Sequence, residues 1–105
     1  MLEGNFQAVR DILMPFAGTG TDHFGLFFSL GRASEELEAF QEAVTFYQKA
    51  LDIRGGIADI LNRIGHCWIR LGAEEEALRV WEKSLEINPD QEDIKARIKS
   101  IKEKR

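Results

Sequence analysis

The feature that most constrains this chain is an internal self-similarity with a period of 34 residues. When the 105-residue sequence is shifted by that amount, small residues fall on small residues and large apolar residues fall on large ones. Periods of about 20 to 50 residues are typical of repeat architectures, in which each copy is one supersecondary unit. The aligned pairs are Gly31 with Gly65, Ala43 with Ala77, Tyr47 with Trp81, Phe27 with Leu61 and Leu30 with Ile64.

Each copy has the pattern of a hairpin of two amphipathic helices. Apolar residues recur at spacings of three and four, which places them on one face of a helix. In the second copy, Gly72 stands where the first helix should end and Pro89 where the second should end. The pattern predicts helices over 23–36, 39–53, 57–71 and 74–87.

The order of these residues resembles the tetratricopeptide repeat, a helix–turn–helix unit of the same period. In the second copy the signature reads Leu61-x2-Ile64-Gly65-x2-Trp68, then Ala77-x3-Trp81, then Pro89. The first copy departs from it, with Ser34 for the large aromatic, Glu38 for the turn glycine and Gly55 for the closing proline. These departures leave one alternative open, in which residues 23–53 continue as a single long helix.

The resemblance implies an all-α fold, a right-handed α-α superhelix (a TPR-like solenoid) of stacked antiparallel helix hairpins with a C-terminal capping helix. By length, residues 1–105 are expected to form a single domain. The register gives a half repeat over 1–21, with its helix over 4–17, repeats over 24–57 and 58–91, and a capping helix over 92–105. For the capping helix, the sequence predicts Asp90 as the N-cap and a buried stripe of Ile94, Ile98 and Ile101.

Composition and charge disfavour several classes of partner. The net charge of −4 argues against nucleic acid, because phosphate binding needs clustered Lys and Arg. The single cysteine cannot form an internal disulfide, which favours a reducing compartment. No apolar run approaches the roughly 18 residues of a membrane span, and the start of the chain lacks the pattern of a secretory signal. We therefore expect a cytoplasmic protein with neither a nucleic acid nor a membrane as partner.

The sequence predicts no catalytic residues, no metal site and no cofactor. His66 and Cys67 are adjacent, so on a helix they point about 100° apart and cannot form a nucleophile pair. Cys67 is expected to be a buried thiol. Acidic residues gather at both predicted inter-helix turns, where carboxylates suit the positive ends of helices. They are Glu35, Glu36, Glu38 and Glu42 at the first turn, and Glu74, Glu75 and Glu76 at the second.

Candidate binding residues follow from the resemblance, because tetratricopeptide arrays bind extended peptides in a concave groove lined by the first helix of each hairpin. On helices 23–36 and 57–71, the face opposite the packing stripe would suit an acidic peptide or a terminal carboxylate. The alternative is an ordinary solvated helix face. The Lys/Asn/Arg clamp of the family's chaperone-binding members is mostly missing, so chaperone-tail binding is not predicted. The candidates are Phe28, Arg32, Asn62, Arg63, His66 and Arg70.

The predicted function is that of a non-enzymatic scaffold or adaptor that binds a partner polypeptide, with an acidic one as a candidate, in its concave groove. The alternative is a homo-oligomerisation module that assembles through the unpaired N-terminal helix. That helix would be the second helix of a repeat whose first helix is absent, so one of its faces would be uncovered.

Overall fold

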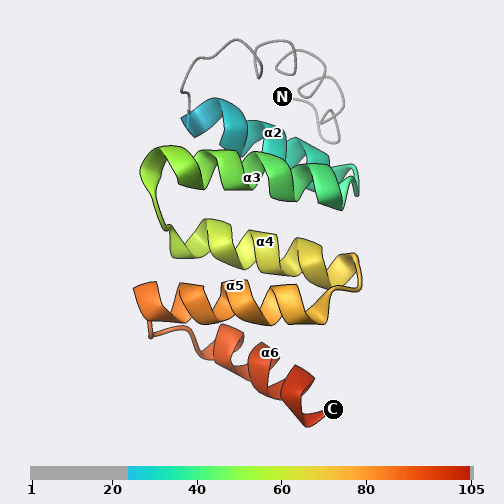
Figure 1. Cartoon of the computed structure of the whole chain (residues 1–105), viewed down its shortest axis with the longest axis vertical. Coiled ribbons are helices and arrows are strands. Elements are labelled where there is room, and N and C mark those ends of the chain that lie inside the picture. The colour runs from blue at the N-terminus through green and yellow to red at the C-terminus, as the bar shows by residue number, and fades with distance from the viewer. Residues whose placement is uncertain (1–23, 105) are drawn as a thin grey trace. The chain divides into compact units, whose positions relative to one another are not determined.

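A computed structural model describes residues 24–104, which are helical and contain no strand within that range (Figure 1). The predicted all-α fold is therefore confirmed, and the predicted bounds of the four hairpin helices agree with the observed ones to within one residue. The predicted half repeat over 1–21 and its helix lie outside the described residues. The helices are α2 (Phe24–Glu36), α3 (Phe40–Arg54), α4 (Ala58–Arg70), α5 (Glu74–Ile87) and α6 (Glu92–Glu103).

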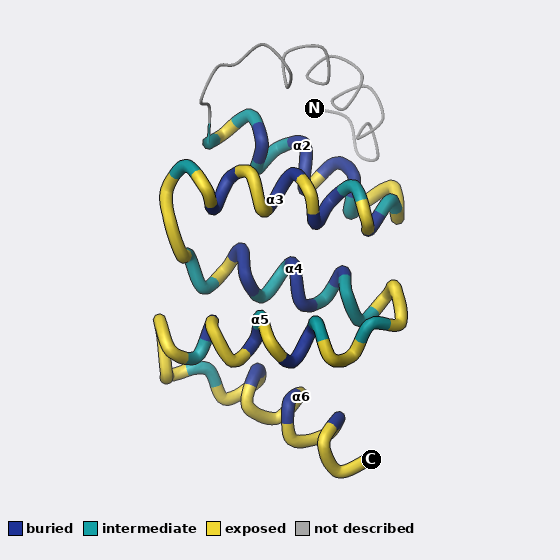
Figure 2. Tube along the Cα trace, in the orientation of Figure 1, coloured by how far each residue is buried: buried dark blue, intermediate teal, exposed yellow. Residues whose placement is uncertain are grey.

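The chain divides into two compact units between Gly55 and Gly56. The first unit contains the antiparallel hairpin of α2 and α3, and the second contains the hairpin of α4 and α5 followed by α6 (Figure 1). The buried residues of each helix recur along one side of it, as the colouring in Figure 2 shows. This is the amphipathic pattern that the sequence predicted. No described helix is long and apolar enough to cross a membrane.

In the first unit, α2 and α3 approach each other closely at a glycine. A Cβ atom added to Gly31 would lie 2.6 Å from Cδ1 of Tyr47, so the ring lies directly against the glycine backbone. Tyr47 is fully buried there, and its hydroxyl donates a 2.7 Å hydrogen bond to the Glu35 carboxylate. The pairing of a small residue with a large one thus sets the distance between the two helices.

The second unit repeats this arrangement with Gly65 and Trp81. A Cβ atom on Gly65 would lie 2.6 Å from Cδ1 of the indole, and Trp81 is 2% exposed. The indole Nε1–H donates a 3.4 Å hydrogen bond to the backbone carbonyl of Asn62. The two hairpins therefore use the same packing contact one period apart.

Both hairpin turns end their first helix in the same way, with one residue in the left-handed conformation. At the second turn this residue is Gly72 (φ 82°), and Ala73 N–H donates a 2.8 Å bond to Trp68 O. At the first turn it is Glu38 (φ 62°), and Ala39 N–H donates a 2.8 Å bond to Ser34 O. This is the Schellman motif. The alternative of a single helix over 23–53 is therefore wrong, because glutamate adopts the backbone conformation that glycine normally supplies.

Helix α6 packs through its three isoleucines, as predicted. Ile94, Ile98 and Ile101 are buried against a cluster that includes Ala77, Leu78 and Trp81. The predicted N-cap is wrong, because Gln91 precedes the helix and occupies that position. Asp90 lies one residue earlier, where its backbone N–H donates a 3.1 Å bond to Asn88 Oδ1.

Candidate functional site

Three of the six candidate residues lie on one side of α4. Arg63, His66 and Arg70 are separated by three and four residues, a spacing that places side chains next to one another on a helix. Arg70 is exposed, His66 is half-buried, and the Arg63 side chain is 34% exposed. We call these three residues the α4 basic face. It presents two guanidinium groups and an imidazole, all of which can donate hydrogen bonds to a carboxylate.

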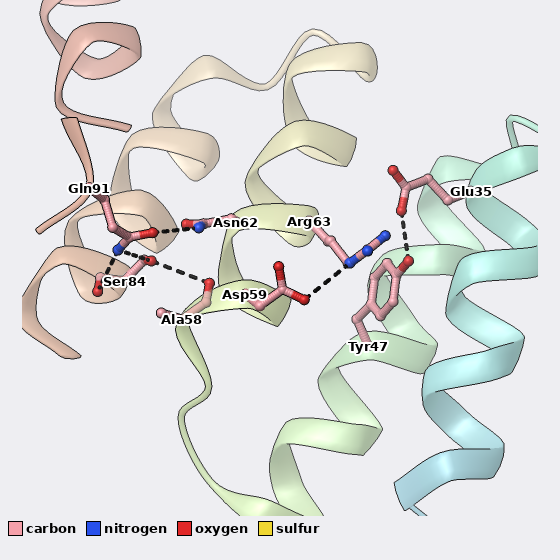
Figure 3. A network of polar contacts seen from close by, with 8 residues as sticks. All are labelled: Glu35, Tyr47, Ala58, Asp59, Asn62, Arg63, Ser84 and Gln91. Atoms are coloured by element: carbon pink, nitrogen blue, oxygen red, sulfur yellow. Dashed lines mark hydrogen bonds and ion pairs between the residues drawn. The ribbon is translucent and has the colours of Figure 1, made fainter. Parts of the chain in front are cut away.

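Arg63 already has an acidic neighbour on its own helix. Its Nε lies 3.5 Å from Oδ2 of Asp59, one turn earlier, and the Asp59 side chain is 70% exposed (Figure 3). An ion pair this exposed contributes little to stability, because water screens both charges. The Asp59 carboxylate can therefore be displaced from Nε of Arg63 without breaking a buried ion pair.

Asn62 lies one turn before His66 on α4, but its amide is engaged in a contact with another element. Its Nδ2 donates a 2.7 Å hydrogen bond to Oε1 of Gln91, immediately before α6. Its Oδ1 is buried and has no hydrogen-bond partner within the described residues. The amide therefore belongs to the junction between α4 and α6, and its use as a ligand-binding group would require that junction to open.

A polar network that the sequence pattern did not reveal surrounds this junction. The Gln91 amide nitrogen lies 3.2 Å from Ser84 O and 2.9 Å from Ser84 Oγ (Figure 3). It also lies 2.9 Å from Asn88 O. Ser84 is fully buried, and its hydroxyl donates a 3.3 Å bond to Ala58 O. The network links the first turn of α4, the last turn of α5 and the residue that precedes α6. Its one sequence signal is Ser84, a polar residue at a position where the first copy has the buried Ala50.

The remaining two candidates lie on α2, in the first unit. Phe28 is half-buried between two other rings, with centroids 6.0 Å from Phe24 and 6.0 Å from Tyr47. The Phe24 and Phe28 rings are nearly parallel, at 5°. Arg32 is exposed one turn further along the helix. Phe28 thus forms part of an aromatic row whose other members pack within the hairpin.

In the part of the chain that the structure describes, the side chains that could bind a metal ion do not come together. Within residues 24–104, no group of three His, Cys, Asp or Glu side chains is placed to hold a metal ion. Cys67 is fully buried, as expected for a thiol that serves packing, while the adjacent His66 is only half-buried. The acidic residues at both turns are mostly exposed.

Comparisons with solved structures find the same fold in other proteins. The chain of a crystal structure of MamA superposes with a TM-score of 0.75 at 23% identity, over 82% of this chain and 50% of that one. The MamA AMB-1 chain gives 0.75 at 25% identity, over 83% of this chain and 48% of that one. The N-terminal domain of stress-induced protein-1 (STI-1) from C. elegans gives 0.71 at 17% identity, over 92% and 94% of the two chains. This chain therefore spans about half the length of the MamA chains it matches.

Sequence comparison identifies the family directly, although no curated protein matches the chain. One model of the tetratricopeptide repeat matches residues 58–91, and a second model of the same repeat matches residues 24–56. These ranges contain both glycine–aromatic contacts and both Schellman turns described above. Tetratricopeptide repeats generally act as non-catalytic protein–protein interaction scaffolds, and this chain belongs to the tetratricopeptide repeat family.

Proposed function

We propose that this chain is a non-enzymatic interaction module and that its α4 basic face binds an acidic segment of a partner polypeptide. The observation that carries the proposal is the placement of Arg63, His66 and Arg70 along one side of α4, each at least partly exposed. Arginine suits this role because its planar guanidinium binds a carboxylate through two parallel hydrogen bonds.

The charge distribution around α4 supports an acidic ligand. The chain carries a net charge of −4, and the first turn of α5 alone contributes Glu74, Glu75 and Glu76. Helix α4, in contrast, has Asp59 as its one acidic residue. A local basic face on a protein of net negative charge attracts acidic segments through its electrostatic field.

The candidates on α2 extend the proposal to the first unit. Phe28 would supply an apolar contact and Arg32 a further guanidinium for the same partner. That these residues and the α4 basic face line one groove stays a prediction, as does a cytoplasmic location. Self-association through the N-terminal helix also stays a prediction, since that helix lies outside the described residues.

Fluorescence anisotropy tests the proposal with a labelled peptide of alternating Glu and Gly and a matching peptide of Gln and Gly. We expect the chain to bind the Glu peptide more tightly than the Gln peptide, and increasingly so at low ionic strength. Replacing both Arg63 and Arg70 by Ala should weaken binding about tenfold, because each exposed ion pair contributes up to about 1 kcal/mol.

The matched control is Arg79→Ala, which removes an exposed guanidinium from α5 that pairs with Glu76 at 3.2 Å. This variant changes the net charge without touching α4 and should bind the Glu peptide nearly as well as the original chain. Equal binding of the Glu and Gln peptides, or equal weakening by Arg79→Ala and by Arg63→Ala, would show that α4 is not the binding face.

A further inference from the structure

We propose that Asp59 is an internal competitor that limits how tightly the α4 basic face holds an acidic ligand. The inference rests on the proposed function, since it concerns the same face and the same class of ligand. Asp59 presents to Arg63 the group that a partner would present, a carboxylate. It therefore occupies the Nε side of the guanidinium until a ligand displaces it.

The geometry of the pair determines which part of Arg63 is occupied. The Asp59 carboxylate reaches Nε of Arg63 through one oxygen at 3.5 Å (Figure 3). One of the two common bidentate arrangements of a carboxylate on arginine uses Nε together with a terminal nitrogen. In that arrangement a ligand must take the place of Asp59, whereas end-on binding through the terminal nitrogens leaves Asp59 near the incoming negative charge. Asp59 opposes the ligand in both cases.

The pair is suited to reversible displacement because it is exposed. Asp59 is 70% exposed and Arg63 34% exposed, so water replaces either partner at little cost. The two residues also lie one turn apart on a formed helix, which keeps the competing carboxylate close without any further movement of the backbone. The result is a small and constant reduction in affinity for acidic ligands.

A purely structural role for Asp59 predicts a different outcome. Asp59 lies in the first turn of α4, where a negative charge stabilises the exposed N–H groups, and Ile57 at the N-cap offers no side-chain hydrogen bond. If stabilising the helix were its main role, Asp59→Asn would lower the thermal stability and leave ligand affinity unchanged or weaker. If Asp59 competes with the ligand, Asp59→Asn should tighten ligand binding instead.

The experiment is a double-mutant cycle on the full chain, with the labelled Glu and Gly peptide as the probe at low salt. We expect Asp59→Asn to tighten binding about two-fold, the size of one exposed pair between residues four apart. In the Arg63→Ala background the same substitution should change the affinity much less, because the group for which Asp59 competes is gone. Glu86→Gln on α5 is the charge-matched control, and it should leave affinity nearly unchanged.

The outcomes separate this inference from the proposed function. If the chain binds the probe and Arg63→Ala weakens binding, but Asp59→Asn has no effect or acts equally in both backgrounds, the competitor role is wrong and the binding face stands. If Glu86→Gln tightens binding as much as Asp59→Asn, the effect is one of net charge and the competitor role is again wrong. If no variant binds the probe, the acidic ligand itself is wrong, and the role of Asp59 with it.

Discussion

Gly65 lies against the indole ring of Trp81 so closely that a single added carbon would overlap the ring. The ring carbon Cδ1 would be 2.6 Å from a Cβ atom on Gly65, and the ring atoms belong to a side chain that is 2% exposed. Trp81 is held in place, because its Nε1 bonds to the Asn62 carbonyl and the side chain is buried in one cluster with the isoleucines of α6. This contact sets the distance between α4 and α5.

Replacing Gly65 by Ala is therefore expected to destabilise the second unit. The added methyl group must push α4 away from α5 or force Trp81 from its position, and overpacking of this kind costs about 1–3 kcal/mol. Urea unfolding followed by circular dichroism measures the change. The control is Gly25→Ala, since nothing lies within 4 Å of a Cβ at that exposed helical position. A Gly65→Ala protein as stable as its Gly25→Ala counterpart would contradict this account of the contact.

The left-handed residue at the first turn offers a substitution that should stabilise the protein. Glu38 has φ 62°, a conformation that costs a residue with a Cβ atom about 1 kcal/mol or more relative to glycine. We expect Glu38→Gly to raise the free energy of unfolding by about 1 kcal/mol. The reverse change at the equivalent position, Gly72→Glu, should lower it by a similar amount, since Gly72 has φ 82°. Thermal denaturation of both variants checks the signs, and a loss of stability in Glu38→Gly would mean that the glutamate side chain contributes more than its backbone costs.

Gln91 is expected to determine how firmly α6 is attached to its hairpin. Its amide bonds to Asn62, Ser84 and Asn88, and Gln91→Ala leaves the part-buried Asn62 amide nitrogen without this partner, at a cost of about 1–3 kcal/mol. Hydrogen exchange should show faster exchange of the α6 amides, with the first unit unchanged. Asp90→Ala is the matched control, because Asp90 is exposed and does not cap the helix, and its effect should stay within about 0.5 kcal/mol. Equal exchange rates of the α6 amides in the two variants would show that Gln91 does not attach α6 to its hairpin.

The sequence predicted the hairpins well because their packing repeats with the chain. Gly31 with Tyr47 and Gly65 with Trp81 are contacts between residues at a fixed separation, so one period reveals both. The same repeat predicted a turn at Glu38 although the family pattern has glycine there, because the apolar residues on either side of it keep the 34-residue register. The backbone of the turn then adopted the glycine-like conformation at the cost of local strain.

The candidate site was less predictable, because its polar contacts do not repeat. Asn62 shares a helix with Arg63, and the family resemblance together with helical spacing assigned both to one binding face. The Asn62 amide instead bonds to Gln91, which is 29 residues further on and lies outside the helical pattern. Nothing in the first copy corresponds to this bond. The prediction of Asp90 as the N-cap of α6 failed for a related reason. Hydrogen bonds of Asn88 with Asp90 and with Gln91 determine the conformation of the chain between α5 and α6, and these bonds do not repeat.

Helix α6 carries three lysines at the positions where α4 carries the residues that face its partner helix. In the 34-residue register, Lys95, Lys99 and Lys102 correspond to Leu61, Gly65 and Trp68. Gly65 contacts Trp81, and Trp68 packs against the same cluster. On α6 the corresponding residues are all exposed. The lysines therefore place charge on the face that would otherwise accept another helix.

Restoring the apolar residues should make the protein self-associate. In the double variant Lys95→Leu and Lys102→Trp, we expect a weight-average mass that rises with concentration in light scattering, because an exposed indole and leucine form an apolar patch on one face of α6. The substitutions break two exposed ion pairs, Lys102 with Glu82 at 3.2 Å and Lys95 with Glu92 at 3.7 Å, and pairs of this kind contribute little to stability. Lys95→Gln with Lys102→Gln removes the same charges without adding apolar surface, and this control should keep the mass of the original chain. If both double variants self-associate equally, charge repulsion alone prevents association; if neither does, the lysines do not protect this face.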